Sequence, residues 1–182
     1  WFDNAAGGYD VRLQRLSATG VELWPHNGVL VADRNLSSTT DYGLAVDTAG
    51  NALLAFNDDS EASERIVAAK ISPDGLAIWG TPGIAVSTST GFLASPRIAG
   101  TDDGDVVVAW FQVSDTVLQR LDPAGAKLWA TDGLVLAHSG DTFVVADLQA
   151  TGANGGLDTG NVIVSWVRYV SFAGAKHLWA QK

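Results

Sequence analysis

The chain alternates between short apolar stretches and polar turns, and one kind of apolar stretch occurs three times. Residues 52–56, 106–110 and 162–166 are apolar runs, interrupted only by Ser165, that end in Phe56, Trp110 and Trp166. Short continuous runs of this kind are typical of strands that are covered on both faces. No window of the sequence shows a 3.6-residue period, so the pattern predicts strands and almost no helix.

A second recurring stretch places glycine, tryptophan and glycine four residues apart. It occurs at residues 11–31, 66–86 and 117–136. The three copies contain Gly20, Trp24 and Gly28; Gly75, Trp79 and Gly83; and Gly125, Trp129 and Gly133. Each copy predicts a third strand, a turn, and a fourth strand that runs through the tryptophan to the following apolar residues. A weaker first strand is predicted before the apolar runs, for example at residues 42–47 and 96–99.

Four short antiparallel strands that repeat every 50–55 residues are typical of β-propeller blades. We therefore predict an all-β chain of about 3.5 propeller-type units, with a part-blade at 1–40, blades at 41–90 and 91–138, and a part-blade at 139–182. Closed propellers have 4 to 8 blades, so the count favours part of a larger propeller. Alternatively, several chains combine to close a ring. Closure within one chain would leave a surplus copy of the third strand of the repeat.

The predicted third strand carries a basic residue at the same place in every unit. These residues are Arg15, Lys70, Arg120 and Lys182, and glutamine precedes three of them, at Gln14, Gln119 and Gln181. We expect these side chains to form repeating polar ties at the blade edges, with Asp side chains as partners. The aromatic residues at the ends of the apolar runs are expected to pack between blades.

The complete pattern extends from Trp110 to Trp129: an apolar strand ending in tryptophan, then Gln-Arg-Leu, glycine, three residues and tryptophan. It resembles the repeat of large, uncharacterised β-propeller proteins that bacteria secrete or display on their surface. The resemblance implies an extracellular, cell-surface or periplasmic location and no particular activity. Residues 72–75 followed by Trp79 are remotely similar to the Asp-box of sialidase-like propellers, but the spacing differs and Asp74 is replaced in the other copies by Thr19 and Ala124.

Composition agrees with a strand-and-turn protein and excludes some partners. The 182 residues carry a net charge of −9, and their acids are 17 Asp against 3 Glu. Asp favours turns, whereas Glu favours helices. An acidic chain with scattered bases lacks the electrostatic footprint of a nucleic-acid-binding protein. No apolar run approaches the ~20 residues of a membrane-spanning helix, and without Cys there is neither a disulfide nor a thiolate metal site.

The densest group of carboxylates is formed by Asp102, Asp103 and Asp105 around Gly104. Such a group is a candidate Ca²⁺ site, because Ca²⁺ is bound by six or more oxygens from carboxylates and loop carbonyls. The alternative is a solvated β-turn in which Gly104 takes the positive-φ position. The spacing differs from that of the Asp-x-Asp-x-Asp-Gly calcium loop.

Two further features are candidates for binding a ligand or partner. Residues 152–160 form a glycine-rich insertion that the other units lack, and its Asn154 and Asp158 are candidate ligand residues. Six of the seven tryptophans occupy repeated positions, which predicts packing between blades. Trp179 breaks the pattern, since it stands where Arg12, Val67 and Val117 stand, and is therefore the candidate partner-binding tryptophan.

The sequence favours a non-catalytic extracellular scaffold or binding module that displays its rim loops to a protein or glycan partner. One alternative is a fragment of a secreted, carbohydrate-active propeller enzyme. Another is a structural subunit of a surface assembly or filament, in which open blade edges pair with other copies or other subunits.

Overall fold

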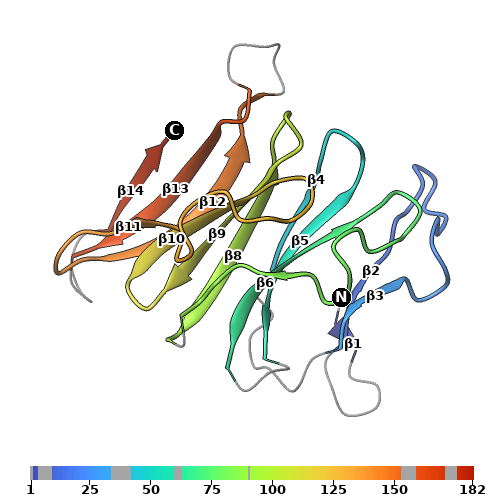
Figure 1. Cartoon of the computed structure of the whole chain (residues 1–182), viewed down its shortest axis with the longest axis horizontal. Helices are drawn as coiled ribbons and strands as arrows, with labels where there is room; N and C mark the ends of the chain where they lie inside the picture. Colours follow the sequence, from blue (N-terminus) through green and yellow to red (C-terminus); the bar gives the residue numbers. More distant parts are fainter. Residues whose placement is uncertain are drawn as a thin grey trace.

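The computed structural model describes residues 2–3, 10–33, 42–59, 63–89, 91–152, 159–170 and 176–182. These residues form four antiparallel sheets and contain no helix, so the predicted all-β fold with four-stranded antiparallel sheets is confirmed. The sheets follow one another across the molecule in chain order, from β2 and β3 at one side to β14 at the other (Figure 1).

Each sheet is a meander in which consecutive strands are neighbours. Sheet 1 contains β1 (Phe2–Asp3), β2 (Asp10–Leu13) and β3 (Val29–Ala32). Sheet 2 contains β4 (Tyr42–Val46), β5 (Ala52–Asp58), β6 (Arg65–Ile71) and β7 (Ile84–Ala85). Sheet 3 contains β8 (Leu93–Gly100), β9 (Val106–Gln112), β10 (Asp115–Leu121) and β11 (Leu134–Leu136). Sheet 4 contains β12 (Thr142–Ala150), β13 (Val162–Tyr169) and β14 (Lys176–Gln181).

The start of the fourth strand differs from the prediction. In the structure β3, β7 and β11 begin only after the second glycine of the repeat, and the preceding tryptophans lie in the connection. The reason is local: Gly28, Gly83 and Gly133 all have positive φ, which turns the chain before pairing with the third strand begins. The connection thereby directs the tryptophan ring at the neighbouring sheet instead of along its own sheet.

The hydrophobic core consists of three layers, one between each pair of successive sheets. Strand β5 contributes side chains to two layers, because side chains alternate between the faces of a sheet. Leu53 and Ala55 enter the layer shared with sheet 3, whereas Leu54 and Phe56 enter the layer shared with sheet 1. Trp110 and Trp166 are buried in the two later layers. The continuous apolar runs are thus explained by burial on both faces.

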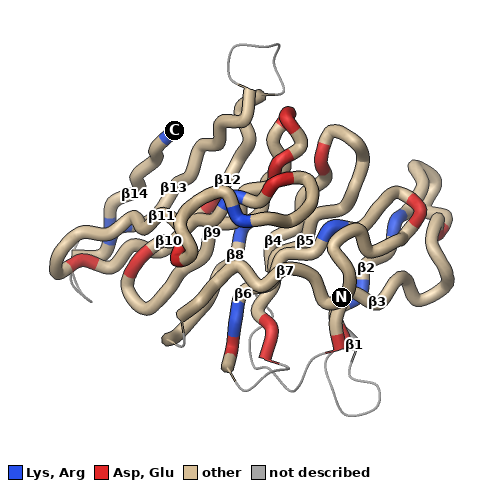
Figure 2. The backbone as a smooth tube through the Cα atoms, in the orientation of Figure 1, with Lys and Arg blue, Asp and Glu red and all other residues tan. Residues whose placement is uncertain are grey.

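The first strands of successive sheets lie beside one another. Strand β4 contacts β8, and β8 contacts β12. The approach of β4 to β8 is close at Gly43, where an added Cβ would come within 2.8 Å of the Arg97 Cα. A larger residue at position 43 therefore requires the two strands to move apart. The acidic positions lie mainly in turns and at strand ends, away from these layers (Figure 2).

Candidate functional site

The repeated tryptophan joins one sheet to the next by a hydrogen bond. Trp24 Nε1 donates to the carbonyl oxygen of Pro73 at 2.8 Å, and Trp79 Nε1 donates to that of Pro123 at 3.1 Å. Both acceptors belong to the turn after the third strand of the following sheet. The glycine of that turn lies against the ring: a Cβ on Gly75 would be 3.2 Å from Trp24 Cδ1. The Gly-Trp pattern of the sequence is therefore a contact between sheets.

The glutamine of the Gln-Arg-Leu motif holds the tryptophan connection in place within its own sheet. Gln119 Oε1 accepts hydrogen bonds from the backbone N–H groups of Trp129 at 3.2 Å and Arg120 at 3.0 Å, while its Nε2 donates to the carbonyl of Ala130 at 2.8 Å. Gln14 makes the same three kinds of bond in sheet 1. The glutamine is a structural residue of the repeat, which the spacing alone did not reveal.

The basic residue of the motif ties the turns of the sheets together. Arg120 Nη2 lies 2.7 Å from an Asp103 carboxylate oxygen, its Nε lies 2.7 Å from Asp105, and its Nη1 donates to the carbonyl of Gly160 in sheet 4 at 2.6 Å. Lys70 Nζ lies 3.1 Å from Asp47. The predicted ties to Asp side chains are thus confirmed for these two residues. Arg15 differs, because its Nη1 donates to a carbonyl, that of Pro73, at 3.1 Å.

The candidate calcium residues are part of this tie. Asp103 and Asp105 face Arg120, and Asp102 Oδ1 accepts a hydrogen bond from the backbone N–H of Gly160 at 2.8 Å. Within the described ranges, no three His, Cys, Asp or Glu side chains are grouped so that they could hold a metal ion. Asp102 therefore joins sheet 3 to sheet 4 directly, and Asp103 and Asp105 do so through Arg120. The geometry adds no support to the Ca²⁺ prediction, which stays a prediction.

Two of the carboxylates that hold basic residues, Asp103 and Asp47, are stabilised in their ionised form. Burial raises the pKa of Asp103, but hydrogen bonds from Thr101 and Asp105 and the nearby Arg120 charge outweigh it, so the net pKa is lowered. Burial likewise opposes ionisation of Asp47, yet hydrogen bonds from Asn51 and the Lys70 ammonium group lower its pKa overall. Both ion pairs therefore persist at neutral pH.

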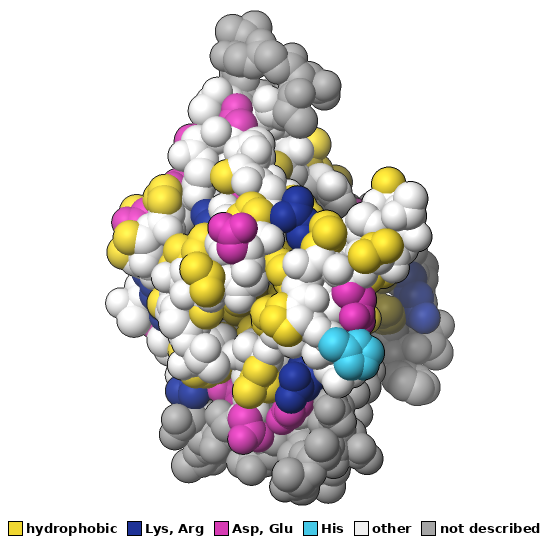
Figure 3. Space-filling model, turned by 90° about the vertical axis from the view of Figure 1, so that its right-hand side faces the viewer, with side chains coloured by type: hydrophobic (Ala, Val, Ile, Leu, Met, Phe, Trp, Pro, Cys, Tyr) yellow, Lys and Arg dark blue, Asp and Glu magenta, His cyan; other side chains and the backbone are white. Residues whose placement is uncertain are grey.

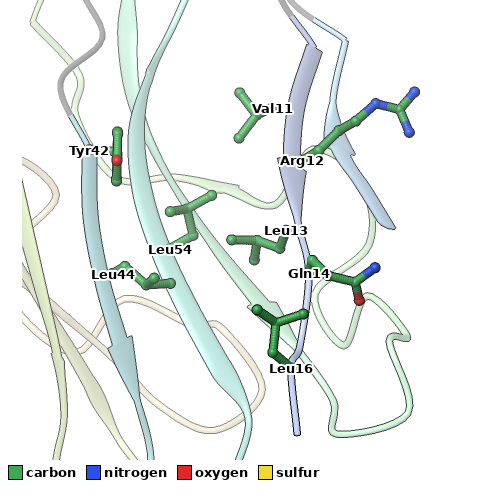
Figure 4. A pocket seen from close by; sticks show the side chains of 8 residues that line it. All are labelled: Val11, Arg12, Leu13, Gln14, Leu16, Tyr42, Leu44 and Leu54. Atoms are coloured by element: carbon green, nitrogen blue, oxygen red, sulfur yellow. The ribbon is translucent and has the colours of Figure 1, made fainter. Parts of the chain in front are cut away.

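An apolar groove, here called the N-terminal groove, lies between β2 of sheet 1 and β4 and β5 of sheet 2 (Figure 4). It encloses about 310 Å³. Leu13 and Leu54 point toward one another across it, whereas Arg12 points away. Leu44 on β4 is more than half exposed. On this edge of β2, strand β1 pairs only with Asp10 and Val11, so within the described chain the rest of the edge has no strand neighbour.

A second groove, here called the C-terminal groove, lies beside the repeated tryptophan of sheet 3. It encloses about 180 Å³ between sheets 3 and 4 and is lined by Trp129, Leu136, Gly160 and the last residues of β14, among others. Trp129 is half-buried, unlike Trp24 and Trp79, which are buried. Its indole N–H has no acceptor among the described residues, although the equivalent group of the other two sheets donates across the interface.

Strand β14 forms the outer edge of sheet 4 and is exposed along its whole length. It carries the candidate partner-binding Trp179, which pairs with Trp166 in the register of β13 and β14 and is 47% exposed. Trp179 therefore lies on the accessible end strand, as a partner-binding role requires. Asn154 and Asp158, the candidate ligand residues of the insertion, lie outside the described residues.

A third hollow of about 450 Å³ lies where β4, β8 and β12 converge, and it is the most polar of the clefts described here. Arg97 enters it next to a bulge in β8, and its Nε donates to the carbonyl of Ala146 at 3.0 Å while Nη1 donates to that of Pro96 at 2.9 Å. Asp147, on a second bulge, accepts hydrogen bonds from Leu148 and Gln149. These polar groups thus have protein partners that fix the shape of the cleft.

Comparisons with known proteins leave the family open. The sequence matches no protein-family model, and a search of curated proteins found no match. Among the described residues, no helix has the length and apolar character needed to cross a membrane. The function must therefore be inferred from the arrangement of this chain's own residues.

The apolar side chains that stay exposed at the two ends were not singled out by the sequence analysis. Leu16, Leu44, Ile163 and Leu178 look like ordinary strand residues in an apolar pattern. The signal that could have identified them is the repeat itself, because their equivalents in other units have a neighbouring sheet on the same side. Figure 3, which views the side that carries β2 and β3 in Figure 1, shows apolar side chains spread over the middle of that face.

Proposed function

We propose that this protein is a non-catalytic scaffold of the β-propeller type that binds other protein chains through two apolar end faces, the N-terminal groove beside Leu44 and the face of β13 that carries Ile163. Four meander sheets in chain order, with the first strands of sheets 2, 3 and 4 side by side and with repeated ties between successive sheets, support the propeller arrangement. In this proposal the two outer faces of the series of sheets bind the partner, and the contacts between successive sheets are structural. Its setting is the extracellular or cell-surface one that the repeat resemblance implies.

The exposure of equivalent residues carries the proposal. Leu44 is 57% exposed, whereas Ile98 and Leu148, which have the same place in β8 and β12, are 5% and 3% exposed. Ile163 is 41% exposed, whereas its equivalents Leu53 and Val107 are fully buried. Leucine and isoleucine at these positions are stabilising only when another sheet covers them. Within the described residues, the two end faces therefore carry apolar side chains of the kind that a neighbouring sheet covers elsewhere in the chain.

Of the functions considered from the sequence, these exposures favour assembly with other chains through open edges. Burying one such side chain contributes about 1.5–3 kcal/mol relative to leaving it exposed. Large exposed apolar patches on soluble proteins commonly mark interaction sites. Display of rim loops to a glycan and the carbohydrate-active enzyme alternative stay predictions from the sequence.

Site-specific photo-crosslinking tests the proposal in the cells that produce the protein. A photoreactive phenylalanine analogue is placed at position 44 or 163, and at position 76 or 113 as a control. Leu76 and Val113 are exposed apolar residues in turns, away from the grooves. We expect covalent adducts with a protein chain, identified by mass spectrometry, from positions 44 and 163 only. Adducts from the turn positions without any from positions 44 and 163 would refute a binding role for the ends.

A further inference from the structure

We infer that the cleft where β4, β8 and β12 converge binds a small carboxylic acid that carries hydroxyl groups, and that Arg97 holds its carboxylate. This site goes beyond the protein binding proposed for the end faces. The cleft encloses about 450 Å³, within the range of about 300–1,000 Å³ that is typical of small-molecule sites. Its walls come from sheets 2, 3 and 4, which are neighbours in the chain, so these residues line it whether or not further sheets continue the series.

Arg97 carries a positive charge that no carboxylate of the described residues balances. Its side chain is half-buried, and its Nε and Nη1 donate to the carbonyl oxygens of Ala146 and Pro96, which are neutral acceptors. The other half-buried arginines of the described residues each pair with aspartate: Arg12 with Asp10, Arg65 with Asp58, Arg120 with Asp103 and Asp105, and Arg168 with Asp141. Because a partly buried charge is costly unless it is paired, Arg97 is expected to take an anion from solution.

The two bonds to the backbone fix the guanidinium and leave donors for a ligand. A guanidinium has five N–H groups, and the bonds to Ala146 and Pro96 use two of them. Both N–H groups of Nη2 and one of Nη1 therefore have no acceptor among the described residues. A carboxylate accepts two parallel hydrogen bonds from a guanidinium, and such bonds are roughly twice as strong as bonds between neutral groups. Arg97 is thus held in place to bind a carboxylate.

Arg97 is not one of the repeated residues of the fold. The equivalent positions in β4 and β12 are Gly43 and Asp147, each one residue before the leucine that is equivalent to Ile98. The repeated glutamine and basic residues maintain contacts within and between sheets, whereas an arginine at this position occurs only in β8. It follows a bulge at which Ser95 has a φ of 52°. Bulges of this kind commonly redirect a side chain beside a functional site.

The other polar groups of the cleft favour a ligand with one negative charge and several hydroxyl groups. Asp147 lines the same cleft, and its carboxylate accepts hydrogen bonds from the backbone N–H of Leu148 at 2.9 Å and from Gln149 Nε2 at 3.1 Å. A dianion would bring a second negative charge toward this carboxylate, which repels it. Asp147, Gln149 and Thr48 instead offer hydrogen-bond partners for hydroxyl groups. A hydroxylated monocarboxylate therefore matches the cleft best.

The first test is a titration of the isotope-labelled protein with glucuronate at neutral pH, followed in its amide NMR spectrum. Glucose has the same ring without the carboxylate and is the matched neutral ligand. We expect saturable shifts of the amide signals of residues 97–100 and 147–150 with glucuronate, and none with glucose at the same concentration. Equal shifts with the two ligands, shifts centred elsewhere, or the absence of a saturable shift overturn the site.

Two arginine variants test the assigned residue. Arg97→Gln removes the charge and should raise the Kd for glucuronate by at least tenfold, because the charge-assisted bonds are lost. Arg15→Gln is the matched control, since Arg15 also donates to a backbone carbonyl but is exposed and lies outside the cleft. It should leave the Kd unchanged. An unchanged Kd in Arg97→Gln contradicts the assignment.

Arg97 also joins β8 to β12 through Ala146, so a purely structural role is the competing interpretation. The titration of the unsubstituted protein separates the two roles, because a structural contact alone gives no saturable shift at residues 97–100. Inorganic phosphate tests the class of ligand: we expect it to bind more weakly than glucuronate, and equal or tighter binding overturns the choice of a carboxylic acid. Photo-crosslinking from positions 44 and 163 reports on protein partners, so the proposed function and this site fail independently.

Discussion

The hydrogen bond between the repeated tryptophan and the next sheet makes a prediction that the chain can test against itself. Trp24, Trp79 and Trp129 occupy the same repeat position, but only the first two donate to a carbonyl of the next sheet, at 2.8 and 3.1 Å. Replacement of each tryptophan by phenylalanine removes the indole N–H and keeps an aromatic ring. The three variants therefore test the combined effect of the bond and of a buried ring against a half-buried ring without the bond.

The expected magnitudes follow from burial and bonding. Loss of the hydrogen bond costs about 1 kcal/mol of unfolding free energy. The smaller ring leaves part of a buried site unfilled, which costs about another 1–2 kcal/mol. Trp24→Phe and Trp79→Phe should each lose about 2–3 kcal/mol, because both tryptophans are at least nine-tenths buried. Trp129→Phe should lose less than about 1 kcal/mol in the monomer, since its ring is half-buried.

Urea unfolding followed by far-ultraviolet circular dichroism measures these differences without relying on tryptophan fluorescence, which the substitutions alter. The measurement is made at a protein concentration at which the chain is monomeric. For a protein of this size a loss of 2–3 kcal/mol corresponds to a fall in Tm of about 4–12 °C. If Trp129→Phe destabilises the monomer as much as the other two variants, the bond to the following sheet is not the source of the effect.

Two further predictions concern the Arg120 tie and the glycines of the tryptophan connection. Arg120→Ala should lower the free energy of unfolding by about 2 kcal/mol at neutral pH, while Lys182→Ala, at the equivalent exposed position, should lower it by less than about 0.5 kcal/mol. The folded-state pKa of Asp103 is lowered from 3.8, so the ionised carboxylate stabilises the fold above that pH and this stabilisation is lost as the pH falls through the lowered pKa. The loss of unfolding free energy caused by Arg120→Ala should therefore shrink in acid. Gly83→Ala should lower the free energy of unfolding by more than about 3 kcal/mol, since the new Cβ meets a carbonyl oxygen of β6. Gly80→Ala, also at positive φ but in open space, should lower it by about 1–2 kcal/mol. Thermal unfolding distinguishes the two variants, and equal losses would contradict the steric argument.

Much of the fold was predictable from the sequence because each repeat states the same pattern again. The apolar runs ending in Phe56, Trp110 and Trp166 are strands; the first two are buried on both faces, whereas Ile163 in the third is exposed. The turns with Gly75 and Gly125 were marked by proline and glycine. The predicted fourth strand began too early, because a tryptophan among apolar residues is typical of a strand. The positive φ of Gly83 and Gly133, which delays the strand, is not visible in the sequence.

The candidate site was less predictable, because the sequence does not say which side chains meet. Asp102, Asp103 and Asp105 form a cluster in the sequence, yet their partners are Arg120, 15 residues beyond the last of them on another strand, and Gly160 in another sheet. These contacts can be identified only from the three-dimensional arrangement of the sheets. The exposed grooves were harder still, since a leucine that lacks its neighbour looks the same in the sequence as one that has it.

The outer face of sheet 1 differs from the polar face that normally terminates a repeat array. Repeat arrays need terminal units with a polar outer face, because the outer face of an internal unit is an interface. Here Leu16 is 58% exposed, while its equivalents Ile71 and Leu121 are 2% exposed and fully buried. The unit that carries Leu16 therefore has the surface of an internal repeat. The proposed binding role depends on this apolar outer face, because a charged residue in place of Leu16 or Leu44 would give the unit the polar face of a terminal repeat.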